Sequence, residues 1–177
     1  MELILADRRV DLIEEGIDVA IHIGPLDDSS LVARKLGESA FHYVASPRFL
    51  AKQGLPNTRE LRSARCIGFS AFETWEVEGV KSRIDPILVV NDLELACEAA
   101  LAGVGIARVP VILCQDAVLD GRLRILFGPK PAMMRAIHVV YPSRVNLPPK
   151  VRHFVDALAA LVEPVPPPRQ RARRRRR

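Results

Sequence analysis

The chain has 177 residues, of which 49% are hydrophobic and 27% are charged, and this is an ordinary globular composition. No run approaches the roughly 18 uninterrupted apolar residues of a membrane-spanning helix, and MELILADRR becomes charged before the core of a signal peptide forms, so we expect a soluble, cytoplasmic protein with no membrane partner. The formal net charge of +5 does not describe the body of the chain, because seven arginines lie in residues 169–177 and residues 1–168 hold 19 basic against 21 acidic residues.

The first predicted elements are a short strand and a short helix. ELILA (2–6) is an apolar run that predicts the strand. Asp7 is a candidate N-cap for a helix over residues 8–15, and Gly16 is a candidate glycine at its end.

The following segments are predicted to be extended. IDVAIHI (17–23) is rich in β-branched residues and lacks alternation, which is typical of a strand covered on both faces in a parallel sheet. Gly24, followed by proline, ends this strand. SLVARKLG (30–37) and ESAFHYVAS (38–46) are two further extended segments that meet at a glycine.

A helix is predicted next, with Ser46 as its cap, Pro47 at the first helical position and Gly54 at its end. Polar residues and glycines then separate three strand-like segments. These are CIGFS (66–70), TWEVEG (74–79) and IDPILVV (84–90).

The clearest helix start in the chain follows. Asn91 is predicted as the N-cap, Glu94 occupies the third helical position of a capping box, and Gly103 ends the helix. The later elements are a strand at VGIARVP, a helix at PVILCQDAVLDG, strands at RLRIL and AIHVVYP, and a helix from about Pro149. Residues 164–177 are proline and arginine rich, which predicts a disordered tail. The other interpretation of this tail is sequence-independent attraction to the phosphates of DNA.

Strands that alternate with helices predict an α/β architecture with mainly parallel pairing. In such sheets ligands bind outside the carboxyl ends of the strands, often against the N-terminus of a helix, where free N–H groups favour anions. The junctions of this kind are Ala6-Asp7, His22-Ile23-Gly24, Phe69-Ser70 and Val90-Asn91-Asp92.

The patterns of catalytic, metal and cofactor sites are incomplete in this sequence. GFSAF (68–72) has phenylalanine where a nucleophile elbow needs its second glycine. GVGIAR (103–108) follows a helix instead of a strand, so its glycines are better explained as a helix end and a close packing contact. Three cysteines and four histidines are spaced unlike disulfide or metal ligands. We therefore expect a binding module, with no catalytic residues, metal or cofactor, and not an enzyme.

The chain resembles a known family over residues 1–163. The segments that carry the resemblance, in order, are DRRVDLIEEGIDVAIHIG, SSLVARKLGES, ASPRFLAKQGLPNTRELRSARCIGF, VNDLELACEAALAGVGIARVP, LDGRLRIL and AIHVVYPSRVNLPPKVRHFVDALAALV. Together they are similar to the effector-binding domain of LysR-type transcriptional regulators, and most similar to the branch that binds aromatic or other small acids.

The resemblance implies a fold like that of type 2 periplasmic binding proteins. Two α/β lobes, joined by two crossing strands, would hold a small effector between them. Lobe I would comprise residues 1–40 and 137–163, and lobe II residues 41–136. The function implied is that of a ligand-sensing regulatory domain that binds a small effector to modulate transcription.

The family pattern also implies that parts of the regulator are absent from this sequence. They are the winged helix-turn-helix that reads DNA and the first strand and first long helix of the regulatory domain, so lobe I would be incomplete. We expect a fragment or a misplaced start, with apolar surface exposed in that lobe. The family forms homodimers or tetramers, but the absent helix contributes to the dimer, so we do not expect that assembly from this chain alone.

The family's effector cleft, carried over position by position, gives the candidate binding residues. These are Asp7, His22, Ile23, Phe69, Ser70, Asn91, Asp92 and His138. At the position of His22 close relatives often have an arginine, which grips a carboxylate permanently, whereas a histidine is charged only near or below pH 6.5.

Each of these candidates also has a structural explanation. His22 fits an interior imidazole equally well, Asn91 and Asp92 are first of all helix caps, and Ser70 fits a turn hydroxyl. The alternative function is a solute-binding protein of a transport system, which shares the lobed fold. An enzyme of unrecognised chemistry comes third.

Overall fold

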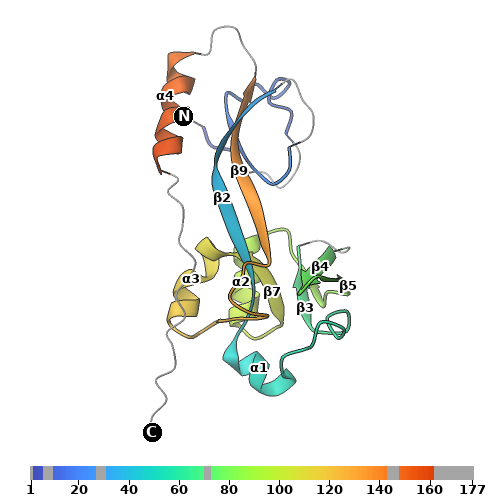
Figure 1. Ribbon diagram of the computed structural model, residues 1–177. Coiled ribbons are helices and arrows are strands. Elements are labelled where there is room, and N and C mark those ends of the chain that lie inside the picture. The colour runs from blue at the N-terminus through green and yellow to red at the C-terminus, as the bar shows by residue number, and fades with distance from the viewer. Residues whose placement is uncertain (1, 6–9, 27–30, 70–72, 143–147, 162–177) are drawn as a thin grey trace. The chain divides into compact units, whose positions relative to one another are not determined.

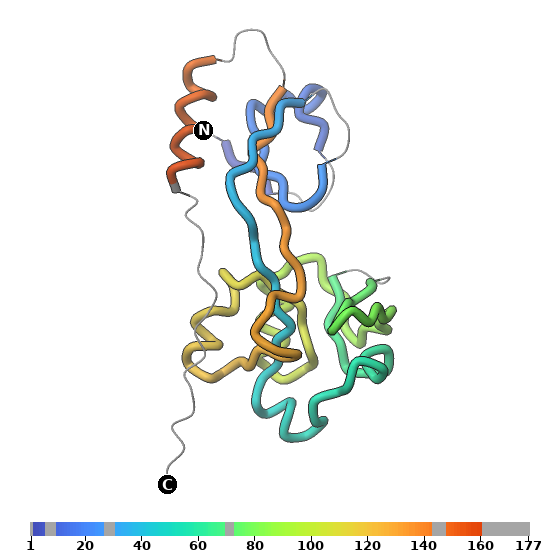
Figure 2. The backbone as a smooth tube through the Cα atoms, in the orientation of Figure 1, coloured from blue at the N-terminus to red at the C-terminus, as the bar shows by residue number. Residues whose placement is uncertain are grey.

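The computed structural model describes residues 2–5, 10–26, 31–69, 73–142 and 148–161. The chain divides into two compact units. Unit 1 is formed by the residues up to Ser39 together with those from Met134, and unit 2 by Ala40–Met133. The chain passes between the units twice, once within β2 (Leu31–Ala45) and once within β9 (Met133–Pro142), as Figure 2 shows. The lobe boundaries near residues 40 and 137 stay a prediction.

Unit 2 is built on a mixed sheet. The end of β2 pairs antiparallel with β7, which pairs parallel with β3, and β3 pairs parallel with β6. β8 pairs antiparallel with the last residues of β2. A separate antiparallel hairpin, β4–β5, completes the strands of this unit. Their bounds are Cys66–Gly68 for β3, Glu73–Val77 for β4, Val80–Ile84 for β5, Leu88–Val89 for β6, Ile106–Pro110 for β7 and Arg124–Ile125 for β8.

Apolar side chains cover both faces of this sheet. One face packs against α2 (Leu93–Leu101) and α3 (Val111–Leu119) in a cluster of twelve buried residues. The other face packs against α1 (Pro47–Gln53) and the β4–β5 hairpin in a cluster of ten. Figure 1 shows these elements around β7. Successive strand residues point to opposite faces, so a sheet that is buried twice produces the unbroken apolar runs seen in the sequence.

Local signals in unit 2 account for several element ends. Ser46 caps α1, since its Oγ accepts a hydrogen bond from the Phe49 N–H at 3.3 Å. Gly103 follows α2 with φ +80°, and a Cβ on Gly105 would lie 2.4 Å from the Arg65 carbonyl oxygen. Both glycines of GVGIAR therefore have the structural roles that the sequence predicted.

Unit 1 holds a smaller sheet and one helix. β1 (Ala20–Ile23) pairs antiparallel with β9, and β9 is hydrogen-bonded to β2. Its core cluster has three buried residues, Val139 of β9 with Val151 and Val155 of α4 (Pro149–Leu161). Arg34 of β2 and Asp18 each form an exposed ion pair with α4.

The structure corrects the predicted start of the chain. Residues 2–5 belong to no strand and are exposed. The described part of the predicted helix is a turn, in which Asp11 accepts hydrogen bonds from the Ile13 and Glu14 N–H groups at 2.9 and 3.1 Å. An isolated strand leaves its backbone groups unpaired, and a single turn is too short to sustain a helix even though its Leu12 is buried. Asp7, the predicted cap, lies outside the described residues.

Four further expectations need correction. β1 is shorter than predicted and antiparallel, with Ile21 and Ile23 more than half exposed. The two segments predicted over residues 30–46 form the single strand β2. β5 follows β4 in a hairpin that the sequence reading missed. Pairing is mixed instead of mainly parallel, because β-branched runs predict strands but not their direction.

Candidate functional site

His22 and His138 are cross-strand partners in unit 1. They lie directly opposite each other in the β1–β9 register, so their side chains share one face of the pair. His22 is exposed, and its Nε2 lies 2.9 Å from the Pro25 carbonyl oxygen. A carbonyl only accepts, so Nε2 carries the proton in this hydrogen bond. The alternative of an interior imidazole does not hold for His22.

His138 has a buried ring nitrogen without a partner. Its Nδ1 makes no hydrogen bond in the described part of the chain. A buried polar atom without a partner is costly in water-free surroundings, and it is satisfied when a ligand or water supplies the missing group. Because this atom is itself buried, it marks an unsatisfied polar group inside unit 1 and not a surface that is open to a ligand.

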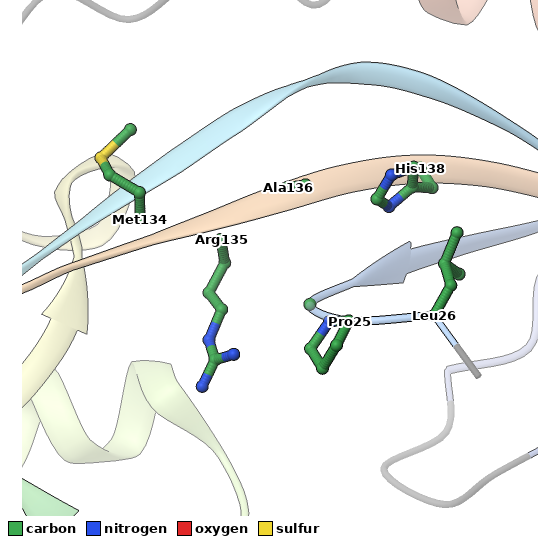
Figure 3. Close-up of a pocket in the computed structure, with 7 residues that line it drawn as sticks. Pro25, Leu26, Met134, Arg135, Ala136 and His138 are labelled. Carbon is green, nitrogen blue, oxygen red and sulfur yellow. The ribbon is translucent and has the colours of Figure 1, made fainter.

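A hollow of about 340 Å³ lies beside His138. It is a shallow depression, widely open to solvent, that combines a turn after β1 with the beginning of β9. In Figure 3 the Arg135 side chain leaves β9 towards the side on which Pro25 lies. The residues that line the hollow are Gly24, Pro25, Leu26, Met134, Arg135, Ala136 and His138.

Arg135 is a functional candidate that the sequence reasoning missed. It is half-buried, lines the hollow and has no hydrogen-bond or ion-pair partner among the described residues. A guanidinium keeps its charge at every physiological pH and fits a carboxylate with two hydrogen bonds. The residue stands just before the segment interpreted as a strand, and only its proximity to the His138 position could have drawn attention to it.

In unit 2 the predicted residues follow two neighbouring parallel strands. Phe69 comes directly after β3, and Asn91 and Asp92 come shortly after β6. Because β3 and β6 are parallel, these residues emerge at the same edge of the sheet, where α/β proteins bind ligands. Phe69 is 45% exposed, so its ring is accessible.

The cap of α2 is Asp92 and not Asn91. Asp92 Oδ1 accepts a hydrogen bond from the Leu95 N–H at 2.7 Å, and α2 begins at Leu93. Glu94 therefore lies at the second helical position, which breaks the predicted capping box. The negative charge of Asp92 already occupies the end of the helix that favours anions, so this helix start is less suited to bind an acid than expected.

A partly buried ion pair lies next to Phe69. Arg108 of β7 pairs with Glu73, the first residue of β4, and their side chains are 16% and 12% exposed. The other oxygen of this carboxylate, Glu73 Oε2, accepts a hydrogen bond from the Phe69 N–H at 2.9 Å. Neither charged residue was predicted, because their partners are distant in the sequence.

The structure thus brings the described candidates together in two groups. His22, Ile23 and His138 belong to unit 1, and Phe69, Asn91 and Asp92 belong to unit 2. Asp7 and Ser70 lie outside the described residues. The assignment of all eight as effector contacts stays a prediction.

Other reactive groups in the described residues are inert or scattered. Burial raises the pKa of the Cys66 and Cys114 thiols to about 12, which removes the thiolate form that reacts. Across the described ranges no three histidine, cysteine or acidic side chains gather as metal ligands would. None of the helices in those ranges has the length and apolar character that crossing a membrane requires.

Known proteins resemble this chain in sequence. The model of the LysR substrate binding domain matches residues 1–163. The chain is 32% identical to the HTH-type transcriptional regulator CrgA of Neisseria meningitidis serogroup B, over 89% of this chain and 56% of CrgA. It is also 32% identical to the HTH-type transcriptional activator AaeR of Escherichia coli K12, over 84% of this chain and 50% of AaeR.

Solved structures agree with these relatives. The regulatory domain of CrgA, a LysR-type transcriptional regulator, has a TM-score of 0.72 at 34% identity, with 84% of this chain and 76% of that domain covered. Full-length AphB, a virulence activator of Vibrio cholerae, has a TM-score of 0.74 at 27% identity, with 86% and 54% covered. The chain therefore spans about half the length of the full-length relatives that it matches.

Proposed function

Because this chain belongs to the LysR substrate binding domain family, we propose that it is the ligand-sensing part of a LysR-type transcriptional regulator. Its relatives are transcriptional regulators and its fold is that of their regulatory domains, which is the type 2 periplasmic-binding-protein-like fold. The alternative role in solute transport finds no support among these relatives. Catalysis has no part in the proposal.

The ligand that we propose is a small carboxylic acid, for example an aromatic acid. The observation that carries this proposal is the hollow in unit 1, which Arg135 and His138 both line, because Arg135 has no hydrogen-bond or ion-pair partner among the described residues. A carboxylate would satisfy Arg135 with paired, charge-assisted hydrogen bonds, and Leu26 and Met134 would supply apolar contact to a ring.

His22 extends this proposal. Its side chain shares a face with His138, which lines the hollow, and its Nε2–H is engaged by the Pro25 carbonyl, so His22 would stand beside the bound acid without lining the hollow itself. Arg135 would provide the permanent attraction for the acid.

Benzoate is a suitable probe for this site. Isothermal titration calorimetry is expected to show that Arg135→Gln weakens benzoate binding by about tenfold or more, because a hydrogen bond to a charged group contributes roughly 1.5–3 kcal/mol. Arg152→Gln is the matched control, since it removes the same charge from an exposed position on α4 in the same unit. Equal affinities of the two variants would show that the hollow is not the binding site.

The same titration tests His22. His22→Ala is expected to weaken benzoate binding by less than Arg135→Gln does, because His22 does not itself line the hollow. Unchanged affinity would remove His22 from the proposed site.

DNA binding and assembly belong to the whole regulator. We propose that DNA is read by the part of the full-length regulator that this chain does not span. Homodimers or tetramers would form through that part as well. The regulator would act in the cytoplasm. The seven arginines of residues 169–177 would add only a salt-sensitive, sequence-independent attraction to DNA phosphates.

A further inference from the structure

β1 is the outermost strand of its sheet and has one open edge. In the strand order β1-β9-β2 it pairs only with β9 among the described residues. Folded proteins usually protect such an edge with a lysine or another charged side chain, a proline or a bulge. The strand AIHI contains no lysine, acidic residue or proline, and its register with β9 is continuous. The edge of β1 is therefore open to another strand.

The hydrogen bonds to β9 show which backbone groups of β1 point towards the open edge. Directly after β1, the Gly24 N–H donates to the Ala136 carbonyl at 2.9 Å. Hydrogen-bonded and non-hydrogen-bonded positions alternate along an antiparallel pair, so His22 also directs its backbone groups towards β9. The N–H and C=O groups of Ile21 and Ile23 therefore point away from β9, towards the open edge.

The side chains of these two isoleucines are also unprotected. Ile21 and Ile23 are both more than half exposed. Ile21 lies opposite Val139 in the β1–β9 register, and Val139 is buried against α4. Both isoleucines therefore extend the apolar face of the sheet that α4 covers only at Val139. Apolar side chains placed alongside them would remove this surface from water.

We propose that β1 pairs antiparallel with β1 of a second copy of this chain, about a two-fold axis at His22. In this register Ile21 lies opposite Ile23 of the second copy, so the two residues exchange their outward-pointing backbone hydrogen bonds. The isoleucines of both copies then form one apolar row on the α4 side of the joined sheet, and the two His22 side chains meet on the other side.

The occupant that fits this edge is a second copy because β1 is complementary to itself. An isoleucine stands on each side of His22, so a half-turn about His22 exchanges the two isoleucines. A register shifted by one residue would place isoleucine opposite histidine, and outward-pointing backbone groups opposite inward-pointing ones. No side chain of β1 carries a permanent charge, so the paired strands do not repel each other.

The contact is expected to be weak because the paired strands are short. β1 has 4 residues, and the pairing of two such strands buries less than the roughly 1,200 Å² that stable protein complexes bury. A dimer that depends on concentration is therefore expected. This contact is separate from the assembly that we propose for the part of the regulator that this chain does not span, and it does not depend on a ligand.

Sedimentation equilibrium of the full chain between about 10 μM and 1 mM measures this association, since weak dimers have dissociation constants in that range. Ile21→Lys is expected to weaken dimer formation by about tenfold or more, because a lysine on an edge strand opposes pairing. Ile13→Lys is the matched control, since it makes the same replacement at another isoleucine of unit 1 that is more than half exposed. This control is expected to dimerise like the wild type.

Three outcomes of this measurement would overturn the proposal. The first is a wild-type chain that stays monomeric throughout the concentration range. The second is equal dimer formation by Ile21→Lys and Ile13→Lys. The third is loss of dimer formation in Leu5→Lys but not in Ile21→Lys, which would assign the contact to the exposed apolar residues 2–5 instead of β1.

Cysteine replacement tests the register, and it also decides the proposal if Ile21→Lys fails to fold. His22→Cys places two thiols opposite each other at the two-fold axis, where the Cα atoms of a non-hydrogen-bonded pair are about 4.5 Å apart, a distance that a disulfide spans. Oxidised glutathione takes two electrons from the two thiols, so that a disulfide joins the copies and reduced glutathione is released. In Ile21→Cys the thiols lie on a diagonal of about 7–8 Å, which a disulfide does not span.

A covalent dimer on a non-reducing gel is the expected result for His22→Cys, formed at least about fivefold faster than for Ile21→Cys. The wild type is expected to stay uncrosslinked, because its cysteines are buried. Faster crosslinking of Ile21→Cys would overturn the proposed register, and no crosslinking of either variant would overturn the pairing. These outcomes stand whether or not the chain binds benzoate.

Discussion

Among the residues that the structure describes, unit 2 buries its sheet under two clusters of twelve and ten residues, whereas the core cluster of unit 1 has three. In unit 1 the apolar residues of the first segment and of β1 are exposed instead. The exposed fractions are 77%, 55% and 90% for Leu3, Ile4 and Leu5, and 55% and 56% for Ile21 and Ile23. An apolar run therefore becomes a buried strand only where the chain supplies a partner to cover it.

The two units are also stabilised by different kinds of contact. Each buried aliphatic side chain contributes roughly 1.5–3 kcal/mol, so the packing of unit 2 outweighs its charges. In unit 1 the helix α4 is joined to the remainder by a small apolar cluster and by the exposed pairs Arg34–Asp156 and Lys150–Asp18. Exposed pairs contribute about 0–1 kcal/mol each. We infer that unit 1 opens more readily than unit 2.

The same substitution in both units gives the largest expected effect. Val109 of β7 and Val139 of β9 are each fully buried, the first in the cluster of twelve and the second in the cluster of three. Val109→Ala is expected to lower the stability of unit 2 by about 2–3 kcal/mol. The substitution removes two methyl groups at roughly 0.8 kcal/mol each, and the cavity that is left adds a further cost. Val139→Ala is expected to cost about 1–2 kcal/mol, since sparse surroundings collapse more easily.

Amide exchange in the strand that carries each substitution measures these two costs separately. A cost for Val139→Ala that equals or exceeds that of Val109→Ala would contradict the contrast between the units. It would show that three buried residues form as tight a core as twelve.

The contrast also explains what the sequence could predict. In unit 2 the Ser46 cap, the helix after Asp92 and the roles of Gly103 and Gly105 follow from local chemistry. In unit 1 the described part of the strand expected at residues 2–6, residues 2–5, belongs to no strand, since pairing is a non-local condition that no local pattern contains. The position of the α2 cap was wrong by one residue because Asn91 and Asp92 have similar capping preferences.

The candidate site divides in the same way. The rule that ligands bind beyond the carboxyl ends of parallel strands placed Phe69 and Asp92 at one edge, and the structure has them after adjacent parallel strands. Arg135, Glu73 and Arg108 were missed because their importance depends on an unpartnered charge or on a partner about 35 residues away.

A second prediction concerns pH and applies to unit 2. His42 is 1% exposed, and neither of its ring nitrogens has a partner in the described ranges. Burial lowers its pKa from the ordinary value of 6.5, because the charged form loses its hydration. Between the lowered pKa and 6.5 the unfolded chain binds more protons, so stability falls as the pH drops below about 6.5, by at most about 1.4 kcal/mol per pH unit.

Replacement by an apolar residue isolates this effect. His42→Leu is expected to make the unfolding transition followed by Trp75 fluorescence less sensitive to pH between about 5 and 6.5. His153→Leu, at an exposed position on α4, is the control and is expected to leave the pH dependence unchanged. A steep loss of stability that persists in His42→Leu would assign the acid sensitivity to other groups.

The smallest expected effect tests the charges of unit 1. The Arg34 and Asp156 side chains are 48% and 60% exposed, and Arg34 Nη1 lies 2.8 Å from Asp156 Oδ1. Asp156→Asn is expected to lower the free energy of opening, measured by the exchange of β9 amides, by no more than about 0.5 kcal/mol. At about 1 M salt, where the screening length is roughly 3 Å, it is expected to lower this free energy by nothing measurable. Glu76→Gln removes one charge of an equally exposed pair in unit 2 and is expected to have a similarly small effect. A cost above about 1.5 kcal/mol for Asp156→Asn would mean that this pair, and not the apolar cluster, keeps α4 docked, and the inferred weakness of unit 1 would then originate in its electrostatics.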